Sequence, residues 1–106
     1  MAKVEEIDAR TLARWMQDGT AFLVDIREVN EWQAERIPGA TLQPMSTLDP
    51  AKLAAPAGKK LVLHCRSGKR TLTVGNAMLA AGQKKAAHLT GGIIAWKEAG
   101  LPTQSG

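Results

Sequence analysis

The amino-acid sequence predicts an α/β domain with a central, mostly parallel, five-stranded sheet and helices on both faces. Segments with helical spacing alternate along the chain with short runs suited to strands. The runs 20–26 and 60–65 are apolar almost throughout, which is typical of parallel strands buried on both faces. With 106 residues, the chain fits one domain over 1–106, with its core at about 4–101.

Composition places the protein among ordinary globular chains, with 44% hydrophobic and 23% charged residues. Cys65 is the single cysteine, which excludes a scaffold held by disulfides and favours a reducing compartment. Apolar stretches are strand-sized, well short of the ~20 residues of a membrane-spanning helix, and no apolar leader is visible. We therefore expect a cytoplasmic protein without a membrane partner.

The first half of the chain carries clear start and stop signals. Asp8 is a good N-cap before Leu12, Trp15 and Met16, which recur at helical spacing, and Gly19 suits the end of that helix. The elements expected here are a strand at 4–7, a helix at 9–18, a strand at 20–26, a helix at 28–35 and, after a turn at 37–40, a strand at 41–43.

The second half repeats the alternation. Ser46 or Thr47 is expected to open a short helix, and Gly82 to end a longer one. The elements expected here are that short helix through Ala54, a strand at 60–65, a helix from Arg70 or Thr71 to Ala81, a strand at 86–89 and a helix at 93–99.

Parallel α/β sheets bind ligands beyond the carboxyl ends of their strands. Asp25, Cys65 and the loop after Leu89 all follow predicted strands. The sequence therefore places a functional site at this rim.

The segment 65–71, CRSGKRT, carries the chemistry of that rim. A helix N-terminus offers free N–H groups that lower a thiol pKa and bind anions. Gly68 lets the backbone curl so that successive N–H groups face inward. The positive charges of Arg66, Lys69 and Arg70 also lower the thiol pKa and attract anions. The pattern predicts a Cys65 thiolate held by amides; the alternative is a small hydrophobe buried in the core.

Two chemistries use a cysteine in such a loop: phosphate-ester hydrolysis and transfer of a sulfane sulfur through a persulfide. Cysteine phosphatases have an arginine six positions after the cysteine, where this chain has Thr71, and Arg70 stands one residue early. The shorter loop favours sulfur transfer. His64 and His88 are interpreted as packed or hydrogen-bonded side chains rather than catalytic bases, and the pattern offers no zinc site.

Four segments together resemble the rhodanese (thiosulfate sulfurtransferase-like) domain. They are 25–32 (DIREVNEW), 37–40 (IPGA), 65–71 (CRSGKRT) and 91–96 (GGIIAW), in the family's order. The resemblance implies a rhodanese fold, a persulfide on Cys65, a sulfur cradle over Cys65–Arg70 and no cofactor. Arg36 stands where the family usually has histidine before IPGA, and we expect this to change little.

The resemblance also divides the site residues by role. Those expected to bind the donor are Arg66, Ser67, Gly68, Lys69, Arg70 and Thr71. Those expected to support the site are Asp25, Arg27 and Glu31, as an ion-pair network, and Gly91 and Gly92, where the backbone passes beneath the loop. Thiosulfate is the expected donor, although Ser67 stands where thiosulfate-preferring members often carry a second cation.

The expected partners are a small anionic sulfur donor and a thiol or protein acceptor. Alternatives are a sulfur-relay module that carries persulfide for a partner protein, and a cysteine phosphatase or arsenate reductase. A nucleic-acid footprint is a further alternative, because residues 37–106 hold 9 basic and 2 acidic residues. Only 4% of residues are aromatic, which argues against nucleic acid.

Overall fold

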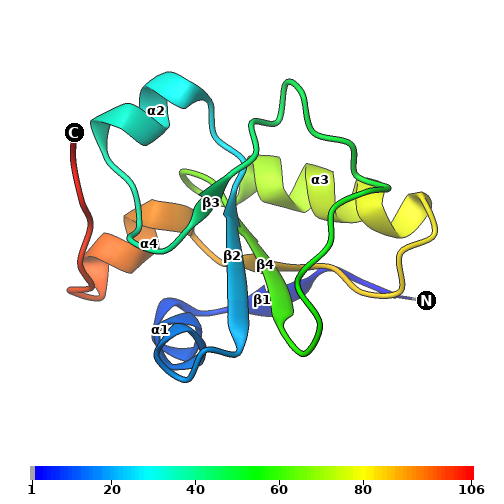
Figure 1. Ribbon diagram of the computed structural model, residues 1–106, viewed down its shortest axis with the longest axis horizontal. Helices are drawn as coiled ribbons and strands as arrows, with labels where there is room; N and C mark the ends of the chain where they lie inside the picture. Colours follow the sequence, from blue (N-terminus) through cyan, green and yellow to red (C-terminus); the bar gives the residue numbers. More distant parts are fainter. Residues whose placement is uncertain (1) are drawn as a thin grey trace.

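The computed structural model describes residues 2–106. In chain order the elements are β1 (Glu5–Ile7), α1 (Ala9–Gln17), β2 (Ala21–Asp25), α2 (Val29–Ala34), β3 (Thr41–Leu42), β4 (Lys60–His64), α3 (Lys69–Ala80), β5 (Ala87–Leu89) and α4 (Gly92–Glu98). The five strands pair in the order β1-β5-β4-β2-β3, and every pair is parallel (Figure 1). The predicted fold class is confirmed, and β4 is the central strand.

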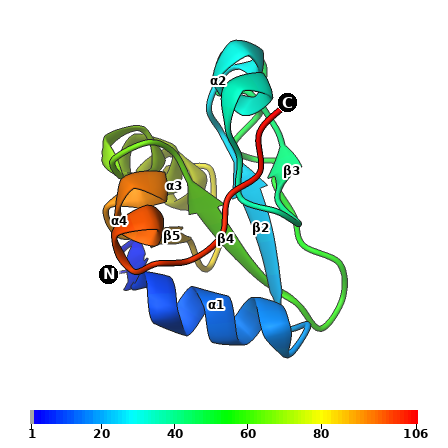
Figure 2. The same cartoon turned by 90° about the vertical axis from the view of Figure 1, so that its left-hand side faces the viewer.

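Alternating side chains of the central strands bury both faces of the sheet. Leu23 and Val62 pack in one cluster with residues of α1 and α4, whereas Val24 and Leu63 pack in a second cluster with residues of α3. Figures 1 and 2 show the same layers, with α1 and α4 on one face and α3 on the other. This arrangement explains why the β2 and β4 sequences are continuously apolar.

The start and stop signals of α1 act as the sequence predicts. The Asp8 side chain accepts a hydrogen bond of 2.7 Å from the backbone N–H of Thr11, and Gly19 follows the helix with a φ of +75°. Helix α3 begins at Lys69, slightly earlier than expected, after Gly68 as its N-cap.

The short helix predicted from Ser46 or Thr47 to Ala54 is wrong. The chain instead forms two separate turns, closed by bonds of 2.9 Å from Leu48 N–H to the Pro44 carbonyl and from Lys52 N–H to the Asp49 carbonyl. Pro50 explains the difference, because it has no N–H to donate and it disfavours the helical conformation of the residue before it.

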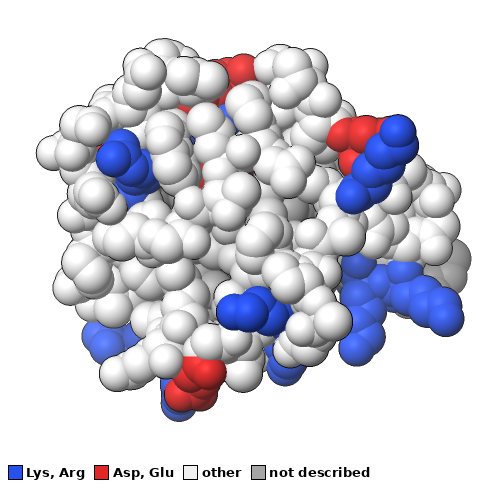
Figure 3. Space-filling model, viewed as in Figure 1, with Lys and Arg blue, Asp and Glu red and all other residues white. Residues whose placement is uncertain are grey.

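The C-terminal segment returns along the molecule toward α2 (Figure 2). Arg36 and Gln104 join it to the chain through two backbone hydrogen bonds, of 2.8 and 2.9 Å. Figure 3 shows Lys and Arg side chains gathered at the lower right edge of a face that is otherwise mostly uncharged. Within residues 2–106, none of the helices combines the length and the apolar character that crossing a membrane requires.

Candidate active site

Cys65 lies directly after the central strand β4, beneath the loop that leads into α3. Its Sγ accepts a hydrogen bond of 3.2 Å from the backbone N–H of Gly68, and the Thr71 hydroxyl oxygen lies 3.7 Å away. The residue is only 1% exposed and touches the core cluster on the α3 face. The thiol is therefore buried, yet polar groups of the loop surround it. Such groups can stabilise a negative charge on the sulfur.

Burial and hydrogen bonding act on this thiol in opposite directions. Burial raises the pKa of Cys65, whereas the backbone N–H groups of Thr71, Gly68 and Ser67 and the Thr71 hydroxyl lower it. The hydrogen bonds prevail, so the pKa of Cys65 lies below its usual value. This cradle of N–H groups favours the thiolate, the reactive form of cysteine.

Two glycines allow the backbones around Cys65 to approach closely. Gly68 has a φ of +98°, which lets its N–H face the sulfur. At Gly92 a side-chain carbon would stand 2.4 Å from the Arg66 carbonyl oxygen and 2.5 Å from that of Cys65. The N–H of Ile93 donates to the Cys65 carbonyl at 2.9 Å and that of Ile94 to the Arg66 carbonyl at 3.2 Å, so α4 supports the loop from below.

Asp25 and Arg27, at the end of β2, form a buried ion pair beside this loop. The Arg27 guanidinium holds the Asp25 carboxylate at 2.7 to 3.0 Å and also donates to the Glu35 carbonyl at 2.7 Å. His64 Nε2 lies 3.3 Å from Asp25 Oδ2, within ion-pair distance but without the alignment of a hydrogen bond. Burial raises the pKa of Asp25, but the neighbouring His64 and Arg27 lower it well below its usual range.

Glu31 joins a different partner from the one that its sequence position suggested. Its carboxylate binds the Arg70 guanidinium through two bonds of 2.8 and 2.9 Å, which connect α2 to the first turn of α3. The Arg70 bond is the main cause that lowers the pKa of Glu31 to about 2. Arg70 is thus held by Glu31, whereas Arg66 and Lys69 are exposed.

The predicted donor-binding cations are not all gathered in one cavity. A cavity of about 350 Å³ beside the loop is lined by Arg66, with Arg27 and Lys97, but not by Lys69 or Arg70. Ile93 and Ile94 of α4 supply its apolar wall.

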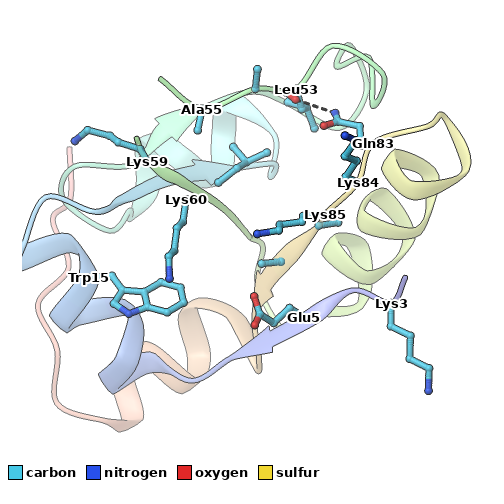
Figure 4. Close-up of a pocket in the computed structure, with 14 residues that line it drawn as sticks. Lys3, Glu5, Trp15, Leu53, Ala55, Lys59, Lys60, Gln83, Lys84 and Lys85 are labelled. Carbon is cyan, nitrogen blue, oxygen red and sulfur yellow. Dashed lines mark hydrogen bonds between the residues drawn. The ribbon is translucent and has the colours of Figure 1, made fainter. Parts of the chain in front are cut away.

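A second cavity, of about 570 Å³, opens at the opposite end of the sheet, where β4 and β5 begin (Figure 4). It holds none of the predicted site residues. In it Lys60 Nζ lies 4.3 Å from the ring centre of Trp15. Its lysines are Lys3, Lys59, Lys60, Lys84 and Lys85. Basic residues from the second half of the sequence therefore lie at both ends of the sheet.

The sequence indicated packed or hydrogen-bonded histidines but did not identify their partners. His88 is 3% exposed and bonds to Thr71 at 2.7 Å and to Glu6 at 3.0 Å. The strand register contains the missing signal, since it places Glu6 beside His88 and Asp25 beside His64. That register was not evident before the strand order was known.

Comparisons with known proteins agree with this combination of a parallel sheet and a cysteine loop. A family model described as a rhodanese-like domain matches residues 8–99, and the chain belongs to that family. The sequence is 40% identical over 97 residues to the uncharacterized protein slr1261 of Synechocystis, covering 92% of this chain and 54% of that protein. It is 35% identical over 100 residues to a protein of Allochromatium vinosum named sulfurtransferase, covering 93% and 94% of the two chains.

Among solved structures, a thiosulfate sulfurtransferase from Pseudomonas aeruginosa superimposes with a TM-score of 0.80 and 29% identity. The match covers 99% of this chain and 20% of that one. The chain thus spans about half the length of the Synechocystis relative and a fifth of the Pseudomonas enzyme. The chain is thus a rhodanese-like domain, and some of its relatives are named sulfurtransferases.

Proposed function

We propose that this domain transfers a sulfane sulfur from a donor such as thiosulfate, through a persulfide on Cys65, to cyanide, a thiol or a protein acceptor. The observation that carries the proposal is the cradle of N–H groups around the Cys65 sulfur, which lowers the pKa of a thiol that burial alone would raise. A persulfide ends in an anionic sulfur, and such donors stabilise negative charge at low cost when they are already oriented.

The transfer has two balanced steps. The Cys65 thiolate attacks the outer sulfur of thiosulfate, a new S–S bond forms, the old one breaks, and sulfite leaves with its electron pair. An acceptor such as cyanide then attacks the terminal sulfur, becomes thiocyanate and restores the thiolate. The protein stays at the same oxidation state over the cycle, and no cofactor is needed.

The donor anion needs cations that are free to meet it. Arg66 and Lys69 are exposed, and Arg66 also lines the cavity beside the loop, so we assign these two the first contact with the donor. Arg70 contributes its charge from the ion pair with Glu31, and Ser67 and Gly68 contribute backbone N–H groups.

Intact mass spectrometry after incubation with thiosulfate tests the proposal. We expect a gain equal to one sulfur atom, its removal by cyanide, and neither result in the Cys65→Ser variant. We also expect Cys65→Ser to abolish turnover, since serine at this position offers no persulfide. A normal sulfurtransferase rate in that variant would contradict the mechanism.

A sulfur carrier that serves a partner protein is the second candidate. The cavity beside the loop favours it, because Ile93 and Ile94 offer an apolar wall next to Arg66, and Ile94 is 39% exposed. A rate with a protein persulfide donor at least about tenfold above that with thiosulfate, a difference of about 1.4 kcal/mol, would favour this role.

Direct assays also test the alternative functions. Hydrolysis of p-nitrophenyl phosphate would indicate the phosphatase or arsenate-reductase alternative, and salt-sensitive DNA or RNA binding that survives loss of Cys65 would indicate a nucleic-acid partner. We propose neither activity, and we propose a cytoplasmic location, which fractionation of cells would test.

A further inference from the structure

A line of three side chains leads from the surface of the sheet to the nucleophile. Glu6 of β1 contacts His88 of β5, with its Oε1 3.0 Å from Nε2. His88 contacts Thr71 of α3, with Nδ1 2.7 Å from the hydroxyl oxygen. That hydroxyl oxygen lies 3.7 Å from Cys65 Sγ. Thr71 and His88 are buried, so water does not compete for the contact between them.

The protons in this line can be assigned from the acceptors at its ends. A carboxylate only accepts hydrogen bonds, so His88 Nε2 carries the proton that faces Glu6. In a neutral ring Nδ1 is then an acceptor, and the Thr71 hydroxyl must donate to it. The hydroxyl proton therefore points away from Cys65 whenever His88 is neutral.

A charged His88 reverses the last bond. With both ring nitrogens protonated, Nδ1 donates to the Thr71 oxygen, and the hydroxyl proton is free to turn toward Cys65 Sγ or toward the Gly68 carbonyl oxygen, which lies 3.2 Å away. Glu6 supplies the negative charge that stabilises the imidazolium, and it accepts a second bond, of 3.3 Å, from the Thr90 hydroxyl. This is the arrangement of nucleophile, base and orienting carboxylate, with one hydroxyl inserted.

We propose that His88, oriented by Glu6, is a positioning residue that couples its own protonation, through the Thr71 hydroxyl, to the ionisation of Cys65. The proton balance is simple: the thiol proton passes to the Thr71 oxygen while the hydroxyl proton passes to His88 Nδ1. The products are a thiolate and an imidazolium, and Thr71 is unchanged. The proposal deepens the proposed function, since the nucleophile is the same.

Other charged groups around His88 are turned elsewhere. Glu5, the neighbour of Glu6 on β1, lines the far cavity. On α3 Arg70 binds Glu31, and on α4 Lys97 binds Glu35. On β4 the register partner of His88 is Leu63, which is apolar. Among residues 2–106, Glu6 is the carboxylate in ion-pair contact with His88.

The rate of Cys65 alkylation by iodoacetamide as a function of pH tests the coupling, because only the thiolate reacts. His88→Asn keeps a polar group near Thr71 but cannot titrate. We expect its alkylation midpoint to rise by about one pH unit, and its rate near neutral pH to fall about tenfold, the effect of losing one nearby opposite charge. Glu6→Gln should move the midpoint in the same direction by less.

Thr90→Val is the matched control, because it removes the other hydrogen bond to Glu6 and leaves the contact between His88 and Thr71 in place. We expect its profile to match the wild type. A wild-type profile in both His88→Asn and Glu6→Gln would overturn the proposal. Glu6 has a side chain 65% exposed, so Glu6→Gln gives an answer even if the buried His88→Asn variant fails to fold.

Coupling between two sites is reciprocal, which gives a second readout. The His88 ring should titrate in the wild type at a higher pH than in Cys65→Ser, as followed by NMR of the ring, because the serine variant lacks the thiolate. Equal midpoints would overturn the coupling. Neither measurement uses a sulfur donor, so failure of sulfur transfer and failure of this proposal are separate outcomes.

Discussion

At the scale of single residues, the buried ion pair between Asp25 and Arg27 is the main polar contact beside the cysteine loop. Asp25 is fully buried, and Arg27, with 4% exposure, depends on it for its main charge partner. The pair lies at the end of β2, and Arg27 also binds the Glu35 carbonyl after α2. The pair thus joins the end of β2 to the segment that follows α2.

We expect Asp25→Asn to destabilise the fold by about 3 kcal/mol or more, because it leaves the Arg27 charge buried without a counter-charge. Urea unfolding at neutral pH would measure the change. Asp18→Asn is the control, since Asp18 is exposed. Equal stability of the two variants would show that the buried pair contributes little.

At the scale of elements, the site depends on how α2, α3 and α4 meet the end of β4. The loop before α3 and the first turn of α3 supply N–H groups to the sulfur, α4 supports the carbonyls of the loop, and α2 reaches α3 through Glu31 and Arg70. Each contact joins segments far apart in the sequence. A shift of one of these helices would therefore move the Cys65 loop through these hydrogen bonds and this ion pair.

Gly92→Ala tests the contact between α4 and the loop. The new carbon would overlap the carbonyls of Cys65 and Arg66, so we expect a loss of about 3 kcal/mol or more, from overpacking and from the left-handed conformation together. Gly58→Ala is matched, because Gly58 has a φ of +81° and open space around it. That control should lose only about 1–2 kcal/mol of unfolding free energy.

The Glu31–Arg70 ion pair predicts an acid dependence of stability. The pKa of Glu31 falls from its usual 4.5 to about 2 in the folded state. The pair therefore contributes stability that is fully present above pH 4.5 and is lost as the pH falls toward 2. Glu31→Gln should lose less stability than the wild type between pH 5 and pH 3 in urea unfolding, while the exposed control Glu98→Gln should behave as the wild type does.

The whole molecule separates its positive charge into two groups along the sheet. Arg66 and Lys69 follow β4, whereas Lys59, Lys60, Lys84 and Lys85 lie where β4 and β5 begin. The five residues of β4 span roughly 16 Å, longer than the Debye length of about 8 Å at physiological salt. The two groups therefore act nearly independently on a small anion.

Charge reversal at each end tests this separation. We expect Arg66→Glu with Lys69→Glu to raise the KM for thiosulfate about tenfold or more, which corresponds to about 1.4 kcal/mol. Lys59→Glu with Lys85→Glu should leave KM within about twofold, because screening removes their field at the loop. Steady-state kinetics at two salt concentrations would measure both, and equal effects of the two pairs would contradict the separation.

Local sequence signals predicted most of the fold and the loop of N–H groups around Cys65. Continuous apolar runs identify β2 and β4, Asp8 and Gly19 bound α1, and the glycine after Cys65 indicates a backbone that turns its N–H groups inward. The helix expected through Ala54 does not form, because Pro50 disfavours the helical conformation of Asp49. These features depend on residues a few positions apart.

The sequence by itself determined the α/β fold class, the position of the single cysteine after β4 and the loop that surrounds it, since each is encoded in a short stretch of chain. Tertiary structure decided which charges meet: Glu31 with Arg70, Asp25 beside His64, and Glu6 with His88 and Thr71. The physical reason is that side-chain pairs across a sheet depend on strand order and register, and these arise only when distant segments pack together.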